Sequence, residues 1–269
     1  SDGTVAIIGA LKRTRFDPEE RIPTPVRVNP GYNPSADAKI TAAVWEAWGV
    51  DAAAVFTHEA LYGYGLGDLM ETVKWSNRAK VNSKKKMGLP PVLEHGEQFP
   101  VVRWDYIVHP IQIAEAAEAG ASAVVIVAAA ALQDLEDLMN AATIMGLEVI
   151  VECHSQLELD FALECGATII CLTDYDRTTN TYKPGRAEEL RAGLSEWIIT
   201  IASGSLSGGS QAWSALDCGF DAVMIGGALL GTRRGEDYVA ELRSRKRDMT
   251  RLFYRAHGFD EDGKFGPRV

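Results

Sequence analysis

Short apolar runs recur along the chain, and each follows a glycine that lies at the end of a helix-like stretch. Five of these runs, AAAVF, AVVIV, EVIVE, TIICL and AVMIG, occupy residues 52–56, 123–127, 148–152, 168–172 and 222–226. Glycine suits the left-handed turn that ends a helix. Continuous runs rich in Val, Ile and Ala are typical of parallel strands, which are buried on both faces. The pattern therefore predicts a repeated helix–turn–strand unit.

Three further apolar runs, at residues 5–11, 100–103 and 197–201, bring the predicted strands to eight. Helical stretches are predicted at residues 36–48, 66–75, 110–119, 132–145, 156–165, 187–192, 210–217 and 236–247. Eight alternations of strand and helix predict an α/β protein, a single-domain (β/α)8 TIM barrel. An open doubly wound sheet is the alternative. It typically carries a glycine fingerprint after the first strand, where this chain has Lys12-Arg13-Thr14.

Three segments are longer than a minimal barrel requires. We assign residues 1–247 to the barrel, with long loops at residues 14–33 and 77–99, and residues 248–269 to a C-terminal extension. The first loop contains four prolines, and the second contains Lys84-Lys85-Lys86. Loops of this length are usually functional or disordered. We expect these segments to provide docking surfaces for other protein subunits.

Composition excludes several classes of partner. The net charge of −10 disfavours binding to the phosphate backbone of nucleic acids. The longest apolar run, residues 123–132, is too short to cross a bilayer, so no transmembrane segment is expected. The four cysteines lack CxxC spacing, which favours reduced thiols over a zinc site. Neither a metal nor a cofactor is expected.

In a TIM barrel, catalytic residues lie where the strands end. Lys12 follows the first predicted strand, and Glu152 ends the fifth. The two side chains could face each other across the barrel mouth as a catalytic cation–carboxylate pair. The alternative is a structural ion pair between two half-buried charges.

Small residues follow the last two predicted strands, namely Gly204 and Ser205 after the seventh and Gly226 and Gly227 after the eighth. Backbone N–H groups at such positions, together with a helix N-terminus, can bind the phosphate of a small molecule. Equally, these glycines could simply form tight turns. His58, His95, His109 and His154 show no metal-ligand pattern, and His109 before Pro110 is expected to be a helix cap or a surface residue.

Several strings of residues resemble the indole-3-glycerol-phosphate synthase family. The most specific is PVVRWDYIVHPIQIAEAAEAGA, which begins at Pro100 and is similar to the family's third strand and the helix after it. The resemblance extends from about residue 5 to residue 230. Its other parts are AIIGALKR, ALYGYGLGDL, GLEVIVECHSQLELDFALECGATIICLTDYD and GFDAVMIGGALL.

The resemblance implies a TIM barrel and a carboxy-lyase reaction of tryptophan biosynthesis. Enzymes of this family close an indole ring on a phosphorylated, carboxylated anilino-sugar, with loss of CO2 and water. That reaction requires a lysine that acts as an acid and carboxylates that guide protons. Lys12 and Glu152 match two of the family's site residues.

Other site positions depart from the family's pattern. Ala10 stands where the resemblance implies a glutamate, and Trp104 stands where it implies the essential lysine of the third strand. Thr173 replaces an asparagine, and Tyr175 replaces an arginine. The seventh strand, around Ser203, lacks the family's glutamate, and Arg15-Phe16-Asp17 replaces a Ser-Pro-Ser that helps to bind phosphate. Tryptophan cannot act as an acid, so a general acid that normally contributes ~10²–10⁴ in rate is missing.

We therefore expect a barrel that has lost catalysis and serves as a binding or scaffold subunit of a larger complex. It would contact other subunits through residues 14–33, residues 77–99 and the tail. The alternative is an active synthase that uses Lys12 and Glu152. A third possibility is another reaction on a phosphorylated ligand, with Lys12, Glu152, Asp105 and Asp174 as its groups.

The chain starts at Ser1 without a methionine, as a chain would after removal of a transit peptide. Together with the resemblance to a tryptophan-pathway family, this favours a plastid location. The cytoplasm is the alternative.

Overall fold

The computed structural model describes residues 4–17, 22–25, 37–87, 98–204, 206, 208–231 and 235–245. Eight parallel strands close a barrel in the order β1-β12-β11-β8-β7-β6-β5-β4, which confirms the predicted (β/α)8 fold class. The barrel strands are β1 (Ala6–Leu11), β4 (Ala52–Phe56), β5 (Val101–Asp105), β6 (Ala123–Val127), β7 (Glu148–Cys153), β8 (Ile169–Thr173), β11 (Ile199–Ser203) and β12 (Ala222–Ile225).

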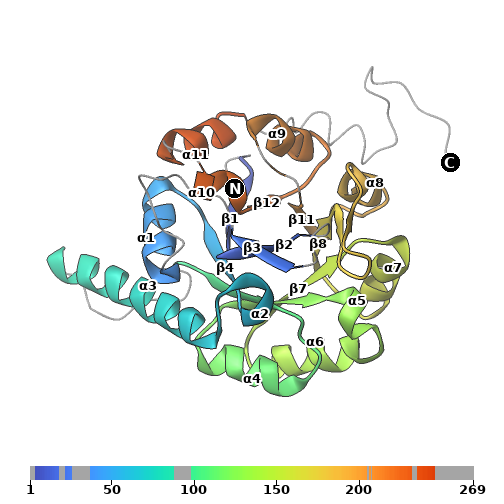
Figure 1. Cartoon of the computed structure of the whole chain (residues 1–269), viewed down its shortest axis with the longest axis horizontal. Coiled ribbons are helices and arrows are strands. Elements are labelled where there is room, and N and C mark those ends of the chain that lie inside the picture. Colours follow the sequence, from blue (N-terminus) through green and yellow to red (C-terminus); the bar gives the residue numbers. More distant parts are fainter. Residues whose placement is uncertain are drawn as a thin grey trace.

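Helices surround the barrel as an outer ring (Figure 1). They are α1 (Ala38–Trp48), α2 (Glu59–Tyr62), α3 (Leu66–Lys86), α4 (Pro110–Glu118), α5 (Ala128–Ala131), the 3-10 turn η2 (Leu132–Asp134), α6 (Leu135–Ile144), α7 (Gln156–Glu164), α8 (Arg186–Arg191), α9 (Gly209–Asp217), α10 (Gly227–Gly231) and α11 (Gly235–Arg243). Every predicted helix has a counterpart among them, although several boundaries differ.

Two boundary predictions were wrong. The helix predicted to end at residue 75 continues to Lys86 as α3, so the first part of the predicted loop 77–99 is helical. Residues 77–86 are rich in Lys and other good helix formers, and propensity extends the helix although the apolar stripe has ended. The seventh strand is Ile199–Ser203 rather than residues 197–201, because Trp197 lies outside it with 91% of its surface exposed.

The predicted loop 14–33 contains a β-hairpin in its described part. Strands β2 (Thr14–Asp17) and β3 (Ile22–Pro25) pair antiparallel directly after β1 ends, and in Figure 1 they project over the ring of barrel strands. The hydroxyl of Thr14 donates to the carbonyl of Leu61 at 2.7 Å, which fixes the hairpin to α2. A second hairpin, β9 (Tyr175–Asp176) with β10 (Thr181–Tyr182), follows β8.

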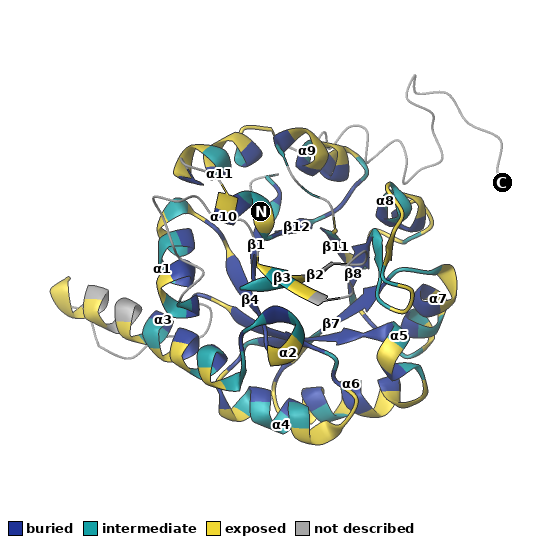
Figure 2. Ribbon diagram, viewed as in Figure 1, coloured by how far each residue is buried: buried dark blue, intermediate teal, exposed yellow. Residues whose placement is uncertain are grey.

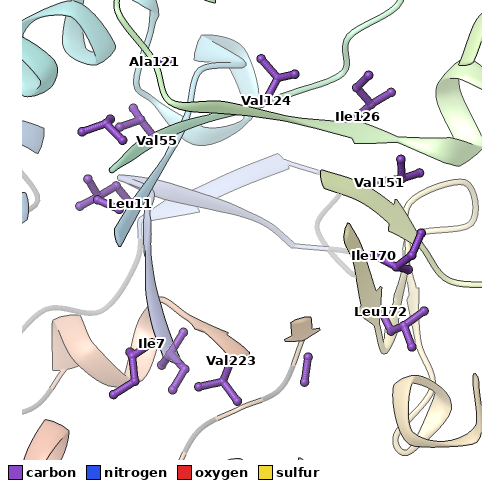
Figure 3. Packing of buried hydrophobic residues seen from close by; sticks show 14 of the residues in the cluster. Ile7, Leu11, Val55, Ala121, Val124, Ile126, Val151, Ile170, Leu172 and Val223 are labelled. Carbon is purple, nitrogen blue, oxygen red and sulfur yellow. The ribbon is translucent and has the colours of Figure 1, made fainter. Parts of the chain in front are cut away.

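Strand side chains alternate between two apolar layers. Ile7, Leu11, Val55 and Val124 belong to the layer between barrel and helices, and Figure 3 shows them pointing outward from the ring of strands. Ile8, Ala10, Ala54 and Val125 instead fill the barrel interior. Figure 2 shows the barrel strands largely buried and the outward faces of the helices exposed. This alternation decides which side chains can enter the barrel mouth.

Within the described ranges, no helix is long and apolar enough to cross a membrane. The same residues contain no group of three or more His, Cys, Asp or Glu side chains that could bind a metal ion. All four cysteines are free thiols. Ser205, the predicted extension 248–269 and the remaining parts of loops 14–33 and 77–99 lie outside the described residues.

Candidate functional site

The barrel strands bring the predicted site residues to a single mouth. Along a strand, every second side chain points to the same face. Lys12 and Glu152 each lie two residues after a side chain of the barrel interior, so they also point inward. The same holds for Trp104, Thr173 and Ser203, which follow Val102, Cys171 and Ile201 at the same spacing. Because all eight strands are parallel, these residues share the C-terminal end of the barrel.

Glu152 is fully occupied by protein partners. Its side chain is 1% exposed, and its Oε2 accepts a hydrogen bond from the indole Nε1–H of Trp104 at 2.8 Å. The guanidinium of Arg177 donates from Nε to Oε1 at 2.6 Å and from Nη2 to Oε2 at 3.3 Å. A buried carboxylate must be paired in this way, because an isolated charge would be costly there. The carboxylate is therefore fixed by two neighbouring side chains.

Arg177 is a site residue that the sequence patterns did not predict. It lies in the turn of the β9–β10 hairpin, with 10% of its side chain exposed, and its guanidinium stacks 4.7 Å from the centre of a Trp104 ring and 4.9 Å from that of Tyr175. Burial alone would lower the pKa of Arg177, but the Glu152 carboxylate, together with Tyr62 and Tyr106, outweighs burial and holds this pKa above its ordinary value. The signal was present, since Arg177 lies two residues after Tyr175, where the family has an arginine.

Trp104 belongs to an aromatic cluster inside the barrel. Its ring stacks on Phe56 at 4.3 Å between centroids and meets Tyr62 and Tyr106 edge-on, each at 5.3 Å. Trp104 and Phe56 are almost completely buried. Such aromatic pairs each contribute about 0.5–1.5 kcal/mol beyond the burial of their surface. The indole is thus held in place by packing as well as by its bond to Glu152.

Lys12 does not form the predicted ion pair with Glu152. Its Nζ lies 4.0 Å above the centroid of the Phe56 ring and 5.3 Å from that of Tyr62, and Glu152 pairs with Arg177 instead. Burial, followed by the positive charge of Arg177, lowers the pKa of Lys12 to about 7, although Glu152 and Cys171 act in the opposite direction. A guanidinium that is always charged is therefore the better partner for the buried carboxylate.

Two carboxylates considered for chemistry serve structural roles. Asp105 points away from the barrel interior, where its Oδ2 accepts from the hydroxyl of Thr57 at 2.8 Å and from Arg103 Nη2 at 3.0 Å. Asp174 accepts the backbone N–H of Ala187 at 2.9 Å near the start of α8. Neither is bonded to Lys12 or Glu152.

The side chains of His109 and His154 act as local hydrogen-bond partners. His109 caps α4, as predicted, with its Nδ1 accepting from the N–H of Ile111 at 3.2 Å and with Gln112 completing a capping box. His154 Nδ1 lies 3.0 Å from the carbonyl oxygen of Thr173. His58 precedes α2 and meets the Tyr106 ring edge-on at 5.6 Å.

The predicted phosphate position lies at the same end of the barrel. Gly227 begins α10, and a Cβ added there would meet nothing within 4 Å. A Cβ on Gly226 would lie 2.9 Å from the carbonyl oxygen of Ala10, so close packing by itself requires this glycine. Gly204 has a φ of 119°, which also requires glycine. The geometry is compatible with both the anion site and the tight-turn interpretation.

The arrangement offers one titratable amine and one carboxylate that is already bound. Lys12 can gain or lose a proton near neutral pH, whereas Glu152 must first release Trp104 or Arg177 before it can contact a substrate. Trp104, in the position that the resemblance assigns to a lysine, brings neither a charge nor an acidic proton.

Comparisons with known proteins agree with the resemblance. The sequence model of the family "Indole-3-glycerol phosphate synthase" matches residues 36–242. An indole-3-glycerol phosphate synthase of Opitutus terrae is 30% identical over 91% of this chain and 82% of its own length. One of Rhodococcus opacus is 28% identical over 77% of this chain and 70% of its own length.

Solved structures show the fold alone. A 3-hexulose-6-phosphate synthase has a TM-score of 0.59 at 14% identity, covering 89% of this chain and 99% of its own. A thiamine phosphate pyrophosphorylase from Pyrococcus furiosus has a TM-score of 0.55, also at 14% identity, over 90% of this chain and 95% of its own. The extent of the sequence matches, together with the closed barrel, leads to one conclusion: the chain belongs to the indole-3-glycerol phosphate synthase family.

Proposed function

We propose that this member of the family does not close the indole ring and instead serves as a binding or scaffold subunit of a larger complex. The observation that carries the proposal is the bonding of Glu152, whose carboxylate oxygens are held by Trp104 and Arg177. A substrate would have to displace Trp104 or Arg177 to reach this carboxylate. The indole is itself completely buried and stacked on Phe56.

The loss of the acid adds to this argument. An indole N–H is a hydrogen-bond donor, but it does not release its proton in the pH range of catalysis. Loss of a general acid alone typically costs about 10²–10⁴ in rate. The positions of Ala10 and Thr173, where the resemblance implies a glutamate and an asparagine, remove further groups of the site. Such losses are not additive, but each weakens a site that depends on preorganised charges.

The proposal is tested by restoring the missing lysine. We expect Trp104→Lys to recover little formation of indole-glycerol phosphate from the anilino-sugar phosphate, because the other replaced groups remain absent. Trp104→Phe, which also removes the bond to Glu152 but adds no acid, is the matched control. Rapid turnover by Trp104→Lys, with none by Trp104→Phe, would show that the lysine is the only group whose loss matters, and substantial turnover by the unaltered chain would contradict the proposal.

An active synthase is the second candidate, and the Lys12 amine favours it. With its pKa lowered to about 7 by burial and Arg177, Lys12 is partly protonated at neutral pH, which suits a general acid. In that case wild-type turnover would fall as pH rises through about 7, and Lys12→Met would abolish it. The absence of turnover in the wild type removes this candidate.

The subunit role depends on surfaces beside the barrel. The described part of the predicted docking loops includes the β2–β3 hairpin and the end of α3, where Lys85, Lys86 and Met87 are exposed. Native isolation of the full-length chain tests this role, and we expect a stable complex several times the mass of one chain. Recovery of the chain only as a monomer would contradict it. A plastid location is part of the proposal, and imaging of the tagged full-length chain would test it.

A further inference from the structure

We propose that Lys12 is a nucleophilic amine that forms a Schiff base with a small aldehyde or ketone entering the barrel mouth. Ring closure on the anilino-sugar does not require this bond. The inference is therefore independent of the proposed loss of that reaction, and either one can fail without the other.

The amine of Lys12 lies against two aromatic rings. Lys12 Nζ lies over the faces of Phe56 and Tyr62, at 4.0 Å and 5.3 Å from their centroids, and both rings are buried. These ring faces shield one side of the amine from water, and they also attract its protonated form. Part of the surface of Lys12 remains exposed to solvent. An amine in an apolar setting that remains accessible is the usual arrangement of a Schiff-base lysine.

Among the charged groups around the amine, Arg177 has the largest effect and disfavours protonation of the amine. The groups that face it are Arg177 from the β9–β10 turn, Glu152 from β7, Cys171 from β8 and Tyr62 from α2. Arg177 donates two hydrogen bonds to the carboxylate of Glu152. Across the described part of the chain, no carboxylate oxygen lies within 4.0 Å of Lys12 Nζ. The charged form of the amine therefore has a cation nearby and no anion bonded to it.

These surroundings keep much of the amine uncharged at neutral pH. Burial, followed by Arg177, lowers its pKa to about 7. An ordinary lysine, with a pKa of about 10.4, has roughly one amine in 2,500 uncharged at pH 7. Lys12 thus presents a far larger fraction of the form that attacks carbonyl carbon.

The chemistry involves only the amine, the carbonyl compound and water. The nitrogen lone pair of Lys12 attacks the carbonyl carbon, the C=O π bond breaks, and a proton moves from nitrogen to oxygen through solvent to give a carbinolamine. Protonation of the hydroxyl by solvent then expels water and leaves a C=N bond with a positive charge on nitrogen. No oxidant or reductant is needed, and hydrolysis reverses the sequence.

Trapping with glycolaldehyde tests the proposal. The purified full chain is treated at pH 7 with glycolaldehyde and sodium cyanoborohydride, which reduces the iminium to a stable secondary amine, and each lysine is quantified by peptide mass spectrometry. Lys74, which is exposed on α3, is the internal control. We expect Lys12 to be labelled at least tenfold faster than Lys74, and labelling of Lys12 no faster than Lys74 would overturn the proposal.

The pH dependence of labelling separates a reactive amine from one that is merely accessible. For Lys12 the rate should reach half its maximum near pH 7, whereas for Lys74 it should still rise near pH 10. Arg177→Gln removes the nearby cation, so the Lys12 midpoint should move upward and labelling at pH 7 should slow several-fold. Arg186→Gln, which removes a cation bonded to the His154 carbonyl, should leave the midpoint unchanged. A wild-type midpoint near pH 10 would overturn the proposal even if Arg177→Gln failed to fold.

Discussion

The charge of Lys12 makes the stability of the barrel depend on pH. In the unfolded chain the amine has a pKa of about 10.4, and in the folded chain burial and Arg177 lower this pKa to about 7. Between these two pH values the unfolded chain binds the additional proton, so the contribution of Lys12 to the free energy of unfolding rises with pH. Below about pH 7 both states are protonated, and the folded state retains the full penalty of the buried charge.

Lys12→Met removes that penalty. We expect the melting temperature of Lys12→Met to exceed that of the wild type most below about pH 7, and this difference to shrink as the pH rises toward 10. Thermal unfolding at several pH values measures it. Lys74→Met is the matched control, because Lys74 is exposed and should give a difference that changes little with pH. A Lys12→Met difference that grows with pH would contradict the assignment.

Gly9 determines how closely α1 packs on β1. A Cβ at this position would lie 2.1 Å from Cε3 of Trp45, a completely buried side chain, so the helix or the indole would have to move. We expect Gly9→Ala to lower the free energy of unfolding by about 1–3 kcal/mol, as overpacking of a core usually does. Chemical denaturation measures the change.

Gly67→Ala is the control for this prediction. Gly67 lies in α3, and a Cβ there would meet nothing within 4 Å. Alanine in a helix is more stable than glycine by about 0.5–1 kcal/mol, so this variant should be neutral or slightly stabilised. Equal effects of the two substitutions would mean that the contact with Trp45 does not limit the packing of α1.

At the scale of elements, Arg103 joins β5 to β4 and α4. Its guanidinium donates to Asp105 at 3.0 Å, to the hydroxyl of Thr57 at 3.0 Å and to the carbonyl of Gln112 at 2.6 Å. The Arg103 and Asp105 side chains are 5% and 9% exposed. Arg103→Met would leave the carboxylate buried without its cation, and we expect a loss of about 3–5 kcal/mol in the free energy of unfolding.

A double variant separates this charge effect from lost packing. Arg103→Met with Asp105→Leu removes both charges, so it should recover part of the stability lost by Arg103→Met alone. Equilibrium unfolding of the two variants supplies the comparison. If the double variant is no more stable than Arg103→Met, the stranded carboxylate is not the cause of the loss.

The elements were predictable from sequence where burial is periodic. Continuous apolar runs such as those of β6 and β12 are buried along their whole length, and the glycines before them do have positive φ. The end of α3 was not predictable in this way, because residues 77–86 form a helix without an apolar stripe. The start of β11 was misplaced because Trp197 and Ile198 extend the apolar run before the strand begins.

The site was predictable only in part. Alternation along parallel strands correctly directs Lys12, Trp104 and Glu152 to one mouth. The predicted partner of Glu152, Lys12, was wrong. Glu152 pairs with Arg177, which lies in a hairpin turn, and the pattern of strand residues does not specify where that turn lies. Once that turn returns to the mouth, a guanidinium with two donors satisfies the carboxylate better than an amine can.

At the scale of the whole molecule, the residues that hold the barrel to its helices are different from those that line its mouth. The outer apolar layer, with residues such as Ile7, Val124 and Leu172, holds the barrel against its helices without using any mouth residue. Residues at the mouth can therefore change while the barrel remains closed. This separation accounts for a chain that matches its family over most of its length and yet has a buried Trp104 at the end of β5.

The most direct test of this account is wild-type turnover of the anilino-sugar phosphate, followed by fluorescence of the indole product. A catalytically active member of the family, assayed alongside, serves as the positive control. We expect no product above a trace, because Trp104 supplies no acid and Glu152 is held by Trp104 and Arg177. Turnover within the ordinary enzymatic range of about 1–10³ per second would contradict the account.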